Sequence, residues 1–234
     1  GGYGELHYDM KKNNGNGELD FHRFILYVKH VFNAEWSLIS EIEIEHNMVG
    51  SYYETDSGVS GGSLDSKGGY VAMEQAYLNY WSGTWGFKSG VVLVPAGITN
   101  EFHEPPTFMS VERPAYNKYI IPSTWFDNGF AFYGAMGDFN WNFTMTGDLD
   151  GDEVGAGIRG SRLKGMKSST TDWTKTLQVS WTGIEGLKVG GSATMNDAPK
   201  DDGSTVGVNL TEINATYSKN NVYSRLEYGT ISYD

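Results

Sequence analysis

Residues 139–149, with the sequence FNWNFTMTGDL, alternate between apolar and polar side chains. Phe139, Trp141, Phe143 and Met145 occupy every second position, and asparagine or threonine fills the positions between them. Successive side chains of a β-strand point to opposite faces, so this spacing predicts a strand with one apolar face and one polar face.

Two further stretches, 173–182 and 36–45, show the same alternation. In the second stretch the polar face carries Glu41, Glu43 and Glu45. Three carboxylates on one strand face need water or cations beside them. Both the aqueous interior of a barrel and the outside of a soluble sandwich would supply water there.

The composition favours strands and turns over helices. Charged residues make up 20% of the 234 residues, aromatic residues reach 14%, and 31 glycines occur with only 6 prolines. No apolar run of about 18 residues is present, so no membrane helix is predicted. A membrane β-barrel contains no such apolar run, because its strands alternate lipid-facing and lumen-facing residues.

The net charge limits the binding partners that the protein can have, and the cysteine count indicates its cellular compartment. A formal net charge of -12 argues against nucleic-acid binding, which needs clustered Lys and Arg. The same charge would disfavour anions in a channel. The absence of cysteine fits passage through an oxidising periplasm.

Eleven strands are predicted, and the connections between them alternate in length. The strands lie near residues 3–9, 18–31, 36–47, 70–81, 85–94, 126–136, 139–149, 171–182, 187–196, 206–217 and 222–233. Tight turns near residues 34, 83, 137, 185 and 220 alternate with long polar connections near 10–17, 48–69, 95–125, 150–170 and 197–205.

Short turns at one rim and long loops at the other are typical of outer-membrane barrels. The predicted fold class is therefore all-β, a transmembrane antiparallel β-barrel formed as a single domain over 1–234, with a periplasmic N-terminus. A β-sandwich with aromatic residues at its edges is the alternative, but it leaves the alternating loop lengths unexplained. In the strand at 206–217 Val208 and Leu210 share a face with Glu212, and a β-bulge is expected there.

Several segments carry a family resemblance. They are FHRFILY (21–27), SEIEIEH (40–46), MEQAY (73–77), GVVLVP (90–95), NEFHEPPTF (100–108), VERP (111–114), IPSTW (121–125) and GIRGSR (157–162). Together they resemble porin-like outer-membrane proteins of the broad phosphate-selective porin O and P group. The resemblance covers about the first 165 residues and is most specific over 90–125.

The resemblance implies a water-filled barrel in the outer membrane of a Gram-negative bacterium, often a homotrimer, with an inward-folded loop. Anion-selective members of the group have a corridor of Arg and Lys. This chain instead presents Glu41, Glu43 and Glu45, so an acidic lumen with a bias towards cations is expected.

Pairing the second and third strands about the turn near Ala34 sets Arg23 opposite Glu45. An outward-facing Arg at the middle of the membrane would cost about 2 to 4 kcal/mol, so Arg23 is expected to face the lumen. The predicted pore-lining residues are Arg23, Tyr27, Glu41, Glu43, Glu45, Asn140 and Asn142.

The connection at 95–125 is long and contains several ionisable residues, namely Glu101, His103, Glu104, Glu112 and Arg113. Long loops with their own order are usually functional. We expect this loop to fold into or over the pore as a constriction; the alternative is a cap on the outer surface without a role in permeation.

No metal or other cofactor is predicted, although two segments carry suitable donors. Glu101, His103 and Glu104 offer zinc ligands, but no second histidine or cysteine lies nearby in the sequence. The weak candidate for calcium is formed by Asp148, Asp150 and Asp152, for which a solvated acidic loop is the alternative.

No enzyme activity is predicted, because no nucleophile, base and orienting group can be named together. His7, His22, His30 and His46 are scattered over different strands and are interpreted as packing or pore-lining residues.

The expected function is passive diffusion of ions and small polar solutes. Two alternatives stay open: a soluble or surface β-sandwich that binds a glycan or a protein, and a structural or docking barrel in an envelope assembly. Bacterial single-chain barrels have an even number of strands, so eleven strands predict that the chain is the N-terminal portion of a longer barrel.

Overall fold

The computed structural model describes residues 1–10, 17–46, 54–55, 58–59, 69–103, 107–110 and 113–234. Its main element is a single antiparallel sheet of 11 strands, in which each strand pairs with its neighbours in chain order. The strands are β1 (Gly2–Met10), β2 (Gly17–Val31), β3 (Trp36–Glu45), β6 (Val71–Trp81), β7 (Trp85–Leu93), β8 (Phe126–Met136), β9 (Phe139–Thr146), β10 (Thr174–Ile184), β11 (Leu187–Pro199), β12 (Thr205–Lys219) and β13 (Val222–Tyr233). The eleven predicted strands are thus confirmed.

The minor elements lie in the long connections. β4 (Glu54–Thr55) and β5 (Gly58–Val59) form a separate two-stranded pair. Short helices occur at α1 (Tyr116–Tyr119), η2 (Val154–Ala156) and α2 (Gly157–Ser161). None of the helices in the described part of the chain has the length and apolarity needed to cross a bilayer.

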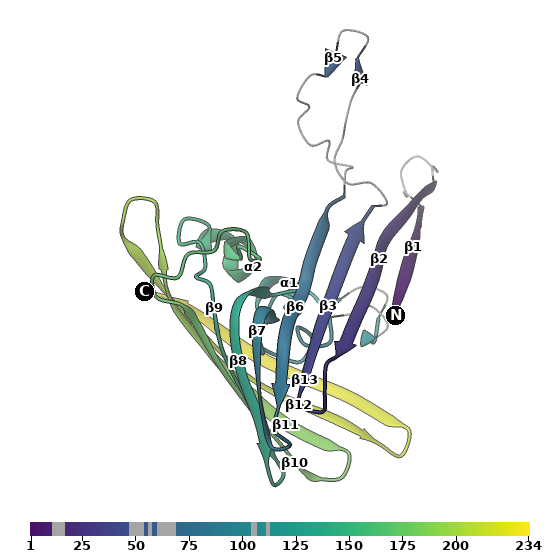
Figure 1. Ribbon diagram of the computed structural model, residues 1–234, viewed down its shortest axis with the longest axis vertical. Helices are drawn as coiled ribbons and strands as arrows, with labels where there is room; N and C mark the ends of the chain where they lie inside the picture. The colour runs from purple at the N-terminus through teal and green to yellow at the C-terminus, as the bar shows by residue number, and fades with distance from the viewer. Residues whose placement is uncertain (11–16, 47–53, 56–57, 60–68, 104–106, 111–112) are drawn as a thin grey trace.

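The sheet is curved, with the tight turns at one rim and the long connections at the other (Figure 1). Local chemistry fixes the turns. The side-chain oxygen of Asn33 accepts hydrogen bonds from the backbone N–H groups of Glu35 at 2.9 Å and Trp36 at 2.8 Å. Gly137 adopts a φ of 59° in the two-residue turn between β8 and β9, a conformation that favours glycine. The predicted alternation of loop lengths is confirmed.

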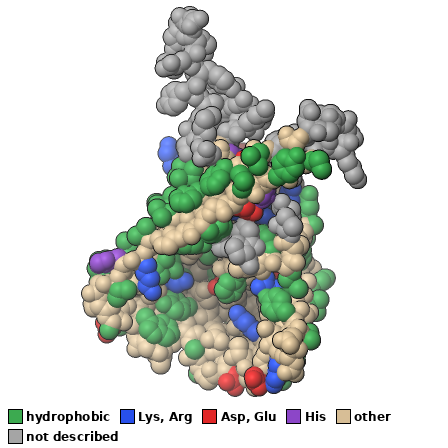
Figure 2. Space-filling model, turned by 90° about the vertical axis from the view of Figure 1, so that its right-hand side faces the viewer, with side chains coloured by type: hydrophobic (Ala, Val, Ile, Leu, Met, Phe, Trp, Pro, Cys, Tyr) green, Lys and Arg blue, Asp and Glu red, His purple; other side chains and the backbone are tan. Residues whose placement is uncertain are grey.

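Polar side chains face the concave side of the sheet and apolar side chains face outward. On β9 and β10 Thr144, Thr146, Thr174 and Thr176 are fully buried, whereas the neighbouring Leu177 is 48% exposed. Figure 2 shows one side of the molecule, where hydrophobic side chains lie on the surface in bands. A soluble sandwich would show the opposite arrangement, with its apolar residues inside.

The buried apolar cluster lies between the inner face of the sheet and the long connections, and it is not formed by two packed sheets. It includes Val94, directly after β7, and Ala96 and Ile121 of the 95–125 connection, packed with Val208 and Leu210 of β12. This packing explains why β12 has apolar residues on its inner face. The expected bulge is wrong, because β11 and β12 pair without a break from Leu187↔Tyr217 to Pro199↔Thr205.

The register of the first strands matches the prediction. Arg23 pairs with Glu45, Ile25 with Glu43, and Tyr27 with Glu41. The two edges of the sheet are β1 and β13, which do not pair with each other among the described strands.

Candidate functional site

The connection at 95–125 lies on the concave side of the sheet, and Asn100 fastens both of its ends (Figure 1). The side-chain amide of Asn100 donates to the carbonyl of Val94 at 2.7 Å and to that of Trp125 at 2.9 Å. Its side-chain oxygen accepts from the N–H of Trp125 at 2.7 Å. Because Asn100 is fully buried, these bonds hold the connection as a closed loop.

The loop reaches one wall of the sheet through His103. Its Nε2 lies 3.0 Å from an oxygen of Glu74 on β6 and 3.7 Å from an oxygen of Glu41 on β3. Its Nδ1 lies 2.9 Å from the carbonyl oxygen of Asn100. All three ionisable side chains are at most 3% exposed.

Both ring nitrogens of His103 face oxygen acceptors, so the doubly protonated ring donates on both sides. Burial lowers the pKa of His103, but the hydrogen bonds to Glu41 and Glu74 outweigh it and set the pKa at about 10. His103 is therefore a cation that ties the loop to β3 and β6.

The same loop reaches the opposite wall. Gln178 of β10 donates to Glu101 at 3.2 Å, and Arg225 of β13 donates to the carbonyl of Thr107 at 3.2 Å. The N–H of Ile98 donates to the carboxylate of Glu227 on β13. With His103 on the other side, the loop bridges the concave space between strands that are far apart in the sheet.

Arg23 points inward, as expected. Its guanidinium lies 2.8 Å from an oxygen of Glu5 on β1 and 3.1 Å from an oxygen of Glu43 on β3. Arg23 is 4% exposed, and Glu41 and Glu43 are each 1% exposed. These carboxylates face the interior, but they lie against the loop and its partners and are not open to water. They serve as anchors for the loop and for Arg23.

The other predicted pore-lining residues also lie on the inner face. Tyr27 and Glu45 are half-buried, Asn142 is half-buried and Asn140 is exposed. Asn140 and Asn142 pair with Ser180 and Gln178 on the next strand, so the polar surface continues towards the short turns.

A cavity of about 170 Å³ remains between the loop and the opposite wall. Its ionisable lining residues are Glu101 from the loop, Lys188 from β11 and Arg225 from β13. A carboxylate therefore faces two cations across this space. Figure 2 shows Lys and Arg side chains in the hollow of the molecule.

Of the other predicted loop residues, Arg113 donates to the hydroxyl of Ser123 at 2.5 Å, within the loop. Glu104 and Glu112 lie outside the described residues. The sequence did not single out Lys88, whose ammonium lies 4.9 Å from the ring centre of Tyr77 and 5.2 Å from that of Tyr133. The available signal was alternation, which sets Lys88 on the face opposite to Trp85 and Phe87 of the same strand.

The carboxylate of Asp148, the first weak calcium candidate, already accepts several hydrogen bonds. It accepts from the backbone N–H groups of Thr171 at 2.6 Å and Trp173 at 2.7 Å, and from the Asn196 amide at 2.9 Å. Asp148 is fully buried, so it is not part of a solvated acidic loop. It organises the backbone ahead of β10.

Asp150 and Asp152, the two other residues of the calcium candidate, have different hydrogen-bond partners. Asp150 accepts from the N–H of Asp152 at 2.9 Å, and Asp152 accepts from the N–H of Asp201 at 2.8 Å. Within the described residues the possible metal-ligand groups are instead Glu41–Glu74–His103 and two groups that share His22. Hydrogen bonds already occupy both ring nitrogens of His103 in the first of these groups.

Comparisons with known proteins place the chain near outer-membrane porins in fold. No protein-family model matches the chain. An uncharacterized protein of Aquifex aeolicus (strain VF5) is 33% identical over 213 residues, which are 88% of this chain and 46% of that protein. The chain thus spans about half the length of the curated relative it matches.

Among solved structures, Salmonella typhi OmpF in complex with daunomycin is similar over 97% of this chain and 63% of that chain, with 12% identity and a TM-score of 0.58. An anion-selective porin from Comamonas acidovorans is similar over 99% of this chain and 77% of that chain, with 14% identity and a TM-score of 0.40. The resemblance to the phosphate-selective porin O and P group stays a prediction. The chain has the all-β fold of porin-like antiparallel β-barrels, with long loops at one rim and short turns at the other.

Proposed function

We propose that the protein forms a channel in the outer membrane of a Gram-negative bacterium, through which ions and small polar solutes diffuse passively. The observation that carries this proposal is the loop at 95–125, tied to Glu74 on one wall and to Glu227 on the other. A loop that crosses the polar interior narrows the passage along the barrel axis but does not block it completely.

Closure of the barrel is part of the proposal. Open backbone groups at a sheet edge are very unfavourable in lipid, so the edges of β1 and β13 must be paired. We propose that further strands of a longer chain complete the barrel between these edges. An intact protein mass well above 25.9 kDa supports this, and a mass equal to it contradicts it.

In the proposed channel a passing ion meets charged side chains at the cavity and not at the buried carboxylates. Glu41 and Glu43 are 1% exposed and face His103 or Arg23, so they present little charge to a passing ion. Glu101, Lys188 and Arg225 line the open space. We propose a modest cation preference that comes from the net charge of -12; at the cavity Glu101 adds to this preference, and Lys188 and Arg225 oppose it.

The direct test is the conductance of the folded protein in planar lipid bilayers. The proposal predicts discrete current steps whose size scales with salt concentration. A folded, membrane-inserted barrel without current steps would instead favour a docking role. Detergent dependence and heat-modifiable gel migration should accompany the steps, since a soluble sandwich would show neither.

A further inference from the structure

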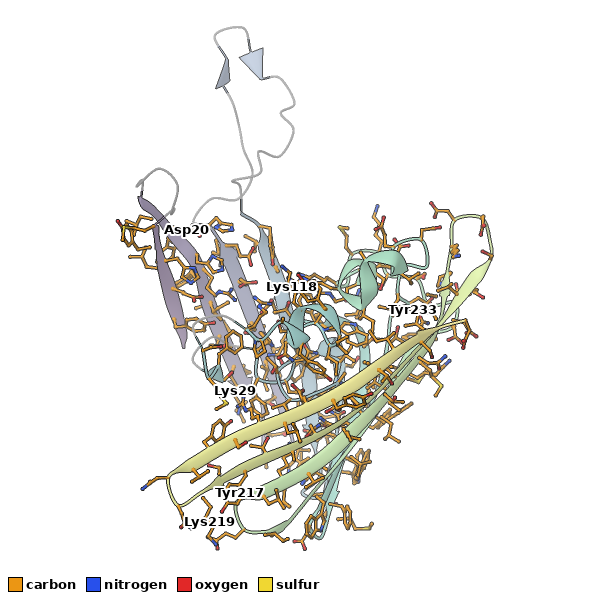
Figure 3. All side chains as sticks on the ribbon, turned by 180° about the vertical axis from the view of Figure 1, so that it is seen from behind. Asp20, Lys29, Lys118, Tyr217, Lys219 and Tyr233 are labelled. Carbon is orange, nitrogen blue, oxygen red and sulfur yellow. The ribbon has the colours of Figure 1, made fainter. Side chains whose placement is uncertain are left out.

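Three histidines that are far apart in the sequence meet on the inner face of the sheet. His7 of β1 stacks on His22 of β2 with ring centres 4.3 Å apart and planes inclined by 6°. The ring of His46, directly after β3, lies edge-on to His22 at 5.3 Å. The cluster lies near the rim from which the long connections leave, where Figure 3 labels Asp20.

A backbone irregularity brings these side chains together. Glu5 pairs with Arg23 and His7 with Asp20, so two steps along β1 match three along β2. The extra residue on β2 forms a β-bulge, which lets His22 share the inner face with Arg23. At the end of β3, His46 has a φ of 52°, and its ring turns towards Asp20.

The groups that converge are those that bind transition metals. The Nδ1 atoms of His22 and His46 lie 3.1 Å and 2.9 Å from the same carboxylate oxygen of Asp20. Ligand atoms of Asp20, His22 and His46 all lie within 4.8 Å of one another. Two ligands of one zinc ion, each about 2.0 to 2.2 Å from it, are about 3 to 3.5 Å apart, so small side-chain movements suffice.

Two further donor side chains adjoin this group through His22. Glu5, His7 and His22 form a second group whose ligand atoms lie within 4.8 Å of one another, and it shares His22 with the first. The side chains of Asp20, His22 and His46 are 28%, 27% and 35% exposed, so an ion can enter from solvent.

We infer that Asp20, His22 and His46, with His7 or Glu5 as the fourth ligand, form a binding site for one divalent transition-metal ion. The imidazole nitrogens define the class of ion, because they suit zinc, copper and nickel, whereas calcium and magnesium take oxygen ligands. To bind the ion through Nδ1, His22 and His46 each take the neutral tautomer with the proton on Nε2, and the Asp20 carboxylate then faces the ion in place of the two N–H groups. The site is separate from the His103 group and does not depend on the proposed function.

The test uses Zn²⁺ as the probe and the full chain, folded in detergent, without a polyhistidine tag and stripped of metals with a chelator that is then removed. Isothermal titration with ZnCl₂ should give one ion per chain with micromolar affinity or tighter. His22→Gln should weaken binding about tenfold or more, since even an outer partner of a metal ligand contributes about 10-fold to 100-fold in affinity.

His30→Gln is the matched control, because His30 lies on the same strand but contacts Phe32 and belongs to neither ligand group in the described residues. It should bind Zn²⁺ as the unchanged protein does. If His22→Gln does not fold by heat-modifiable migration, His46→Gln decides the question, since His46 lies beyond the last residue of β3. Absence of Zn²⁺ binding by the unchanged chain, or equal binding by the folded variant, would overturn the assignment.

Discussion

His103 on the long loop and Glu74 on β6 are joined at 3.0 Å, although 29 positions separate them in the sequence. The pair is almost fully buried, with exposures of 3% and 1%. It is the contact that fixes the loop to the strands carrying the buried carboxylates.

Substitution of either partner should release the loop and destabilise the protein. Breaking one side of a buried ion pair costs about 3 to 5 kcal/mol, because the other charge remains buried without its partner. We therefore expect His103→Gln and Glu74→Gln each to lower the midpoint of heat-modifiable unfolding clearly. The double variant should lose less stability than the sum of the losses of the two single variants, because the two residues act together. Strict additivity would show that the contact contributes nothing.

The contribution of His103 to folding stability should decrease as the pH rises. The pKa of His103 in the folded protein is about 10, above the ordinary 6.5. A raised pKa means that the protonated form is stabilised on folding, so its contribution is complete below about pH 6.5 and lost as the pH rises through about 10. The difference in melting temperature between the unchanged protein and His103→Gln should shrink over that range. A difference that grows with pH would contradict the assignment of His103 as a cation.

The charges at the cavity should set ion selectivity. Glu101→Gln leaves Lys188 and Arg225 facing the opening, so the reversal potential in a salt gradient should move towards anions. Lys188→Gln should move it towards cations. Glu185→Gln is a control of equal charge change, since Glu185 lies in a tight turn and is 86% exposed. The shifts should be largest at low salt, where screening is weakest.

Asp148 should matter for stability, with no need for calcium. Its carboxylate accepts two short hydrogen bonds from backbone N–H groups, at 2.6 Å from Thr171 and at 2.7 Å from Trp173. Hydrogen bonds to a charged group contribute about 1.5 to 3 kcal/mol, so Asp148→Asn should be destabilising by at least about that amount. Asp150→Asn, in the same motif, should be near neutral. Added calcium should leave the melting temperature of the unchanged protein as it is; a calcium-dependent rise that Asp148→Asn abolishes would restore the metal-binding hypothesis.

The strands and their register were predictable because they depend on local patterns. Alternation defined β9, and the tight turn at Asn33 fixed the pairing of Arg23 with Glu45. The course of the long loop was not predictable in detail. It depends on contacts such as that between Ile98 and Glu227, which are 129 positions apart and leave no local signal.

Two interpretations failed for different structural reasons. Val208 and Leu210 suggested a bulge because the inner face of a barrel was expected to be polar, but the loop supplies an apolar surface there. The histidine cluster was missed because strict alternation assigns His22 and Arg23 to opposite faces, and only the bulge on β2 brings them to the same one.

The central claim is that the loop at 95–125 occupies and narrows the passage through the barrel. It is tested most directly by the single-channel conductance of a variant in which residues 101–119 are replaced by a short Gly-Ser linker. This change removes His103 and the contact of Thr107 with Arg225 but keeps Asn100, which fastens the loop ends. The account predicts a conductance clearly higher than that of the unchanged protein, and an unchanged conductance from the folded variant would contradict it.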